Sequence, residues 1–118
     1  QTCALPIFGT HGILLSHDEK SLYASNRLEG SISVIDIATR KVTAKWNTGG
    51  SPDMGQLLPD GKQFWVSSRY HARVMAIDTA TGKVLARIPT DTEPQGLTYF
   101  PTSRGARSVG HNGVYLLD

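Results

Sequence analysis

An internal repeat restricts the possible folds of this chain more than any other feature of its sequence. Residues 18–39 reappear as residues 60–81, and every matched residue stands 42 positions after its counterpart with no gap. Each copy contains short runs of strand-forming residues that end in an aspartate, and a threonine follows three positions later. A period of roughly 40 to 45 residues built from short strands is typical of β-propeller blades. The repeat therefore predicts an all-β propeller of four-stranded antiparallel blades.

The same period divides the chain into units. We expect blade repeats at about residues 11–52 and 53–94, and an incomplete repeat at 95–118. Together they form a partial propeller over residues 9–118, while residues 1–8 fit no repeat position and are expected to be a non-native or disordered lead-in. Because closed propellers contain roughly four to eight blades, we expect the chain to be the C-terminal part of a larger ring. Missing blades of the same protein would then cover apolar side chains on the outer faces.

Turn signals between the apolar runs predict the strand positions, and no window has the spacing of an amphipathic helix. Asp36 and Asp78 end the third strand of their repeats, where a short carboxylate can accept backbone N–H bonds. We therefore expect both aspartates to be structural. Tyr23 and Trp65 are expected to pack between adjacent blades, and Trp46 in the core. The expected strands are residues 12–15, 21–26, 31–36, 41–46, 56–58, 63–68, 73–78, 83–88, 108–112 and 114–118.

Composition excludes several classes of protein. The formal net charge is only +2, and the basic residues are spread along the chain instead of forming a run. This distribution argues against a nucleic-acid partner. No stretch approaches the ~18 apolar residues of a membrane span. Cys3 is the only cysteine, so the chain cannot form an internal disulfide.

One set of polar residues recurs at the period of the repeat. His11, Asp53 and Gln95 stand 42 positions apart, in or just before the first strand of each repeat. In a propeller these inner strands line the central channel, so the three side chains are expected to converge at its mouth. An imidazole, a carboxylate and an amide could bind a cation or a polar ligand there. Polar residues also line such channels simply because water fills them, and the sequence leaves metal binding open.

A second set of residues follows the second strand of each repeat. Arg27 and Arg69 are repeat equivalents on the loops that lead to the third strand, and aromatic and basic residues stand near them. Such a group could form a rim that binds an anion or a carbohydrate, although solvated loop arginines are the alternative interpretation. The expected rim residues are Arg27, Arg69, Tyr70, His71, Arg73 and His111.

Several segments resemble a known family of repeat proteins. Residues 16–26 and 59–68 resemble the turn and second strand of YVTN-type β-propeller repeats, and residues 34–39 and 76–84 resemble their third strand and following turn. The family's Tyr-Val-Thr-Asn core reads Tyr-Ala-Ser-Asn at residues 23–26. The resemblance implies a seven-bladed bacterial or archaeal protein that is periplasmic, located at the cell surface or secreted.

This resemblance does not imply a single activity, because relatives of similar shape bind ligands or catalyse unrelated reactions. We expect a non-enzymatic binding or interaction scaffold of the bacterial cell envelope. Its partner would be a protein or a small polar ligand at the loop face or the channel mouth. The alternative is a propeller enzyme with a channel-centred site, either a metal-dependent lactonase-like hydrolase or a redox dehydrogenase. No catalytic residue is predicted, since no nucleophile elbow is present, and no motif identifies a cofactor.

Overall fold

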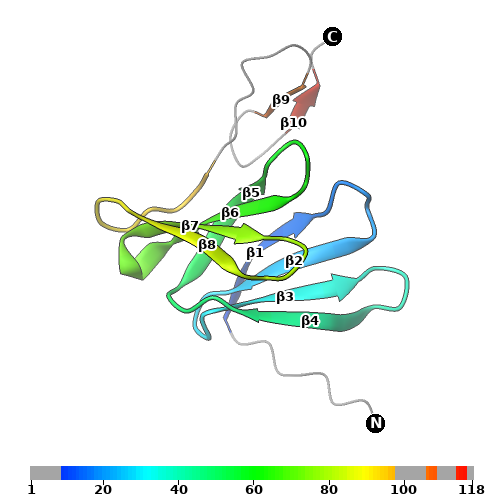
Figure 1. Ribbon diagram of the computed structural model, residues 1–118, viewed down its shortest axis with the longest axis horizontal. Coiled ribbons are helices and arrows are strands. Elements are labelled where there is room, and N and C mark those ends of the chain that lie inside the picture. The colour runs from blue at the N-terminus through cyan, green and yellow to red at the C-terminus, as the bar shows by residue number, and fades with distance from the viewer. Residues whose placement is uncertain (1–8, 98–105, 109–113, 117–118) are drawn as a thin grey trace.

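The computed structural model describes residues 9–97, 106–108 and 114–116. It contains two four-stranded antiparallel sheets whose strands are hydrogen-bonded in sequence order (Figure 1). The two complete blades predicted from the repeat are therefore confirmed. The first sheet is formed by β1 (Thr10–Leu15), β2 (Ser21–Asn26), β3 (Ser31–Asp36) and β4 (Lys41–Asn47). The second is formed by β5 (Pro52–Leu57), β6 (Gln63–Ser68), β7 (Arg73–Asp78) and β8 (Val84–Pro89), with the short helix η1 (Arg69–His71) after β6.

Three predicted strand positions need correction. β1 begins at Thr10, two residues before the predicted start at residue 12. β5 begins at Pro52 and not at residue 56, because a register shift between Pro52 and Gly55 interrupts the alternating pattern that marks a strand in a sequence. In the third repeat, β9 (Ala106–Ser108) pairs antiparallel with β10 (Val114–Leu116), so the strand expected at 108–112 starts earlier than predicted. Residues 109–113 and 117–118 lie outside the described residues.

The hydrophobic core lies between the two sheets. The ring of Tyr23 on β2 stacks on Phe64 of β6 with centroids 5.8 Å apart, and its centroid lies 5.3 Å from that of Trp46 on β4. Tyr23 and Trp46 therefore pack as predicted. Trp65 is half-buried and, by strand alternation, faces away from Phe64. The buried core residues are Tyr23, Ile32, Trp46, Leu57, Phe64, Val66, Met75 and Ile77.

Two glycines allow the sheets to approach each other closely. A Cβ atom on Gly12 of β1 would overlap the backbone carbonyl oxygen of Asp53 on β5. On the outer strand β4, the indole of Trp46 lies directly against Gly82 of the second sheet, whose φ of +75° also favours glycine. The inner strands β1 and β5 are thus adjacent, as the blades of a propeller require.

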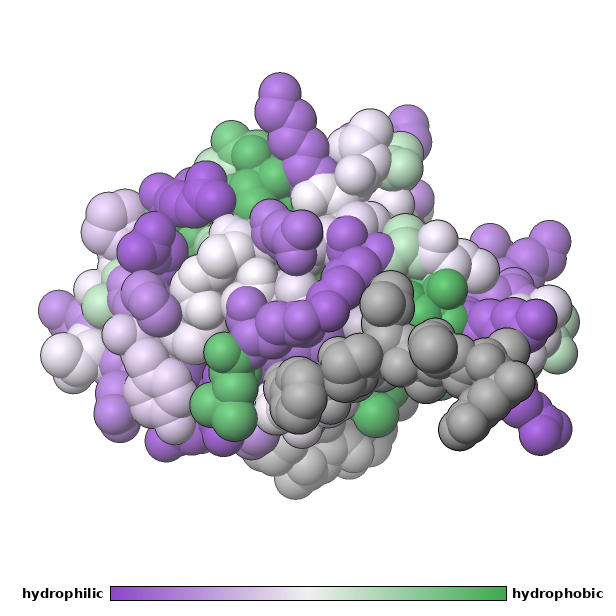
Figure 2. Space-filling model, turned by 90° about the horizontal axis from the view of Figure 1, so that it is seen from below, coloured by the Kyte–Doolittle hydropathy of each residue, from purple (hydrophilic) through white to green (hydrophobic). Residues whose placement is uncertain are grey.

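The apolar side chains outside this core are dispersed. On the face shown in Figure 2, hydrophobic groups are separated by hydrophilic ones. Ile13 and Leu15 on β1 and Leu85 and Ile88 on β8 are exposed. These residues lie on the first and last strands of the two sheets. Within the described part of the chain, no helix has the length and apolar character needed to cross a membrane.

The aspartates that end the third strands have the predicted structural role. Asp36 Oδ2 accepts hydrogen bonds from the hydroxyl and the backbone N–H of Thr39, at 2.7 and 2.8 Å. Asp78 Oδ2 accepts one from the Thr81 hydroxyl at 2.6 Å. Hydrogen bonds from the threonine hydroxyls are the main reason that the pKa of each carboxyl lies below its ordinary value of 3.8.

These turns are expected to contribute to the acid sensitivity of the fold. Because the pKa of each folded carboxyl is lowered, the stabilisation is present above pH 3.8 and is lost as the pH falls below it. Replacing both residues, Asp36→Asn and Asp78→Asn, should therefore flatten the decline in the free energy of unfolding between about pH 5 and about pH 2. Urea unfolding across this range measures the effect. An unchanged decline in the double variant would contradict it.

Candidate functional site

The pairing of the inner strands β1 and β5 is irregular near their starts, and each irregularity contains a polar residue. In β1, Thr10 pairs with Asn26 while Gly12 pairs with Ser25, so His11 is an extra residue in a bulge. In β5, the register shifts at the equivalent place, between Pro52 and Gly55, and this interval contains Asp53. Bulges re-aim side chains and are common beside active sites.

These two side chains meet. The Nδ1 atom of His11 lies against Oδ1 of Asp53 within ion-pair distance. The Asp53 side chain is 1% exposed, whereas that of His11 is 40% exposed. The predicted channel-mouth pair is thus brought together by the adjacent inner strands. Gln95, the third residue of the predicted set, is exposed, and its backbone carbonyl accepts a hydrogen bond from the Ser67 hydroxyl. Its side chain does not join the His11–Asp53 contact.

Two arginines from the predicted rim also reach Asp53. Nη1 of Arg27 lies 3.5 Å from Asp53 Oδ2, and Nη1 of Arg69 lies 4.0 Å from the same oxygen. Their side chains are 21% and 25% exposed. The channel set and the rim set, predicted as separate groups, therefore form one site. We call His11, Arg27, Asp53, Arg69 and Tyr70 the charged cluster.

The ring of Tyr70 belongs to this cluster because it supports both arginines. The guanidinium carbons of Arg27 and Arg69 each lie 5.5 Å from the ring centroid. At this distance the quadrupole of the ring attracts the cations. Tyr70 itself is 55% exposed, so it forms a wall of the site that solvent can reach.

Hydrogen bonds to Ser51 fix the segment that carries Arg69 and Tyr70. The backbone N–H of Arg69 donates to the Ser51 carbonyl at 3.1 Å, and that of Tyr70 donates to the Ser51 hydroxyl at 2.8 Å. The same hydroxyl lies 3.1 Å from Nδ1 of His71. His71 is thus occupied in holding η1 and does not contact Asp53. His111, the remaining rim residue, lies outside the described residues.

A buried polar network fixes the loop that carries Arg27. The fully buried side-chain amide of Asn26 donates to the hydroxyls of Ser31 and Ser33, at 3.0 and 2.8 Å. Its oxygen accepts a hydrogen bond from the Thr10 hydroxyl at 3.1 Å. Arg27 follows directly on this anchored residue, so its backbone position is set by β1, β2 and β3 together.

The charged cluster contains polar atoms that are buried without hydrogen bonds. Among the described residues, nothing hydrogen-bonds to Oδ2 of Asp53, to Nε and Nη1 of Arg27, or to Nε of Arg69, and the contact with His11 is the only polar one at Oδ1 of Asp53. Buried polar groups are nearly always satisfied by protein, water or ligand. Two guanidinium groups also face a single carboxylate here. The arrangement suits the binding of a polar molecule that completes these hydrogen bonds.

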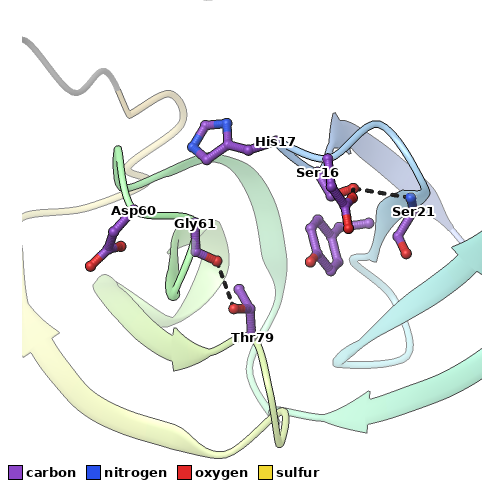
Figure 3. A pocket seen from close by; sticks show the side chains of 8 residues that line it. Ser16, His17, Ser21, Asp60, Gly61 and Thr79 are labelled. Carbon is purple, nitrogen blue, oxygen red and sulfur yellow. Dashed lines mark hydrogen bonds between the residues drawn. The ribbon is translucent and has the colours of Figure 1, made fainter.

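A second candidate site lies at the opposite end of the strands. It is a hollow of about 290 Å³ between the two repeats. Figure 3 shows the side chains that line it. Its carboxylates already accept hydrogen bonds within their own turns. Asp18 accepts them from the Ser16 hydroxyl and the Lys20 N–H, and these bonds lower its pKa. Asp60 accepts one from the Lys62 N–H. The hollow therefore has fewer groups free for a ligand than the charged cluster has. Its lining residues are Ser16, His17, Asp18, Ser21, Tyr23, Asp60, Gly61 and Thr79.

Metal-ligating groups are sparse around these sites. Across residues 9–97 and the two short strands that follow, no three His, Cys, Asp or Glu side chains gather closely enough to hold a metal ion. The charged cluster supplies only His11 and Asp53 as ligands of this kind.

Comparisons with known proteins agree with the blade architecture. A family model described as YNCE-like beta-propeller matches residues 6–103. Among solved structures, the chain is similar to hydrazine synthase from Kuenenia stuttgartiensis, with a TM-score of 0.76 and 24% sequence identity over 86% of this chain and 29% of that one. It is also similar to a luciferin-regenerating enzyme, with a TM-score of 0.61 and 18% identity over 75% of this chain and 33% of that one. No curated protein matches the sequence.

Proposed function

We propose that this chain, which belongs to the YNCE-like beta-propeller family, is part of a non-enzymatic binding scaffold that holds a small polar ligand at the charged cluster. The chain spans about a third or less of the length of the two similar structures. Their low sequence identities support the fold and carry no activity to this chain. The proposal therefore rests on the site itself. Its location in the bacterial cell envelope is a further part of the proposal, supported by the resemblance to exported propeller repeats.

The observation that carries the proposal is the buried Asp53 carboxylate together with two incompletely bonded arginines. Leaving such buried groups without hydrogen bonds costs roughly 1–3 kcal/mol each. A fold that needed these residues only for stability would be expected to satisfy them internally. Ligand sites instead hold a few convergent polar groups ready for a partner.

An enzyme is the second candidate function, and the His11–Asp53 contact is the observation that favours it. An imidazole oriented by a carboxylate can act as a general base, and the same two residues could contribute to a metal site. No third metal ligand accompanies them among the described residues. We therefore place the scaffold first.

A panel of three probes tests the binding function. Sodium acetate, choline chloride and glucose represent an anion, a cation and a neutral polar molecule. Titration into the ¹⁵N-labelled chain should produce saturable shifts of the Arg69 and Tyr70 amides with at least one probe, because these amides lie beside the cluster. The amide of Lys62, in the turn at the other end of the strands, serves as the control. Shifts with none of the three probes would contradict the proposal.

Measuring the metal content distinguishes the scaffold proposal from the enzyme alternative. Under the scaffold proposal, metal content is the same in the unmodified chain and in the His11→Ala and Asp53→Ala variants. Stoichiometric metal that is lost in both variants would overturn the non-enzymatic assignment and favour the hydrolase.

A further inference from the structure

We infer that the ligand of the charged cluster carries a singly charged oxyanion, of the kind a carboxylate group presents, and that Arg27 and Arg69 bind it together. This inference rests on the proposed function and specifies its ligand. It follows from the unsatisfied donors, the charge balance and the exposure of the cluster.

The unsatisfied donors are the first step. Nε and Nη1 of Arg27 and Nε of Arg69 are buried and lack hydrogen-bond acceptors. Asp53 lies within ion-pair range of both arginines, but at 3.5 and 4.0 Å and without hydrogen-bond geometry. A guanidinium group offers several N–H donors in a fixed plane and no acceptor. The group that completes the site must therefore supply acceptor oxygens, and a carboxylate supplies two in matching geometry.

The charge balance is the second step. With His11 neutral, two guanidinium groups face one carboxylate, which leaves one positive charge in excess. A monoanion neutralises this excess. A dianion would bring a second negative charge close to the buried Asp53 carboxylate, and repulsion in a poorly solvated region is costly. The cluster is thus expected to prefer acetate to sulfate.

Exposure is the third step. Arg27 and Arg69 keep about a quarter or less of their side-chain surface in contact with solvent, and Tyr70 beside them is half-exposed. A small anion can therefore approach the exposed parts of the two arginines and of Tyr70 from solvent. Asp53 acts as a positioning residue, because it limits the repulsion between the two guanidinium groups that share the Tyr70 ring.

The test compares acetate, sulfate, choline and glucose on the chain and its variants. Acetate should shift the Arg69 and Tyr70 amides saturably and more tightly than sulfate does. Arg27→Gln and Arg69→Gln should each weaken acetate binding about tenfold or more, the expected effect of removing a charge-assisted pair. Arg69→Lys should give an intermediate loss, because it keeps the charge but not the planar fork. Arg40→Gln, on the exposed turn between β3 and β4, is the matched control and should leave binding unchanged.

A second measurement uses the unmodified chain, so it tests the inference even if the arginine variants do not fold. Acetate should raise the melting temperature of the unmodified chain more than chloride at equal ionic strength, since it binds the folded state alone. Equal melting temperatures in the two salts would contradict the inference. So would acetate binding that survives both glutamine variants, or tighter binding of sulfate.

The outcomes also distinguish this inference from the proposed function. If glucose or choline shifts the cluster amides and acetate does not, the oxyanion assignment fails while the binding function stands. If none of the probes shifts them, both fail.

Discussion

Replacing Asp53 with alanine is expected to lower the free energy of unfolding by about 2–4 kcal/mol. Removing one partner of a buried ion pair typically costs about 3–5 kcal/mol, because the remaining charge is left uncompensated. We reduce this figure because Arg27 and Arg69 are partly exposed, at 21% and 25%. The loss is nevertheless large beside the total stability of a domain, roughly 5–15 kcal/mol. Urea denaturation followed by circular dichroism measures it.

Two variants control for the loss of side-chain volume and for nonspecific effects. Asp53→Asn keeps the shape of the side chain but removes its charge, so most of the destabilisation should persist. Asp91→Ala removes an exposed aspartate that has no described side-chain partner and should change stability by less than about 0.5 kcal/mol. If Asp53→Ala were as stable as the unmodified chain, the two arginines would not depend on the carboxylate, and the role given to Asp53 would be wrong.

The strands of this protein could be predicted because the repeat doubles the evidence for each of them. Residues 21–26 and 63–68 align without gaps, and the structure forms β2 and β6 over these ranges. The inner strands were harder to predict. β5 starts four residues earlier than expected because its bulge breaks the alternation of apolar and polar residues. The same irregularity holds Asp53, so the least predictable part of the sheet is also the part that forms the site.

The residues of the site could be identified from the sequence, but the sequence did not show that they form a single site. His11 and Asp53 were found as one periodic set, and Arg27 and Arg69 as another. An antiparallel hairpin places the start of its first strand beside the end of its second, as the pairing of Pro52 with Ser68 shows. Applying this register would have placed Arg69 near Asp53. It would not have shown that Arg27, from the neighbouring blade, reaches the same carboxylate, because that contact depends on how closely the two sheets pack.

Gly12 controls this packing, and Gly12→Val is expected to destabilise the chain by about 3 kcal/mol or more. Overpacking usually costs about 1–3 kcal/mol. Here the added atoms would meet the backbone carbonyl oxygen of Asp53, which cannot move aside as a flexible side chain can. Relief requires β1 to move away from β5, which separates His11 from Asp53 and weakens acetate binding at the charged cluster. Stability and binding should therefore fall together in this variant.

Graded substitutions at the same position isolate the steric cause. Gly12→Ala should give a smaller loss than Gly12→Val, because alanine adds fewer atoms toward Asp53. Gly96→Ala is the control, since a Cβ atom at Gly96 would meet no atom within 4 Å. Urea unfolding and the acetate titration measure the two effects, and the nuclear Overhauser contact between the rings of Tyr23 and Phe64 reports whether the sheets separate. A Gly12→Val chain with unchanged stability and an intact ring contact would show that β1 does not lie against β5 in solution.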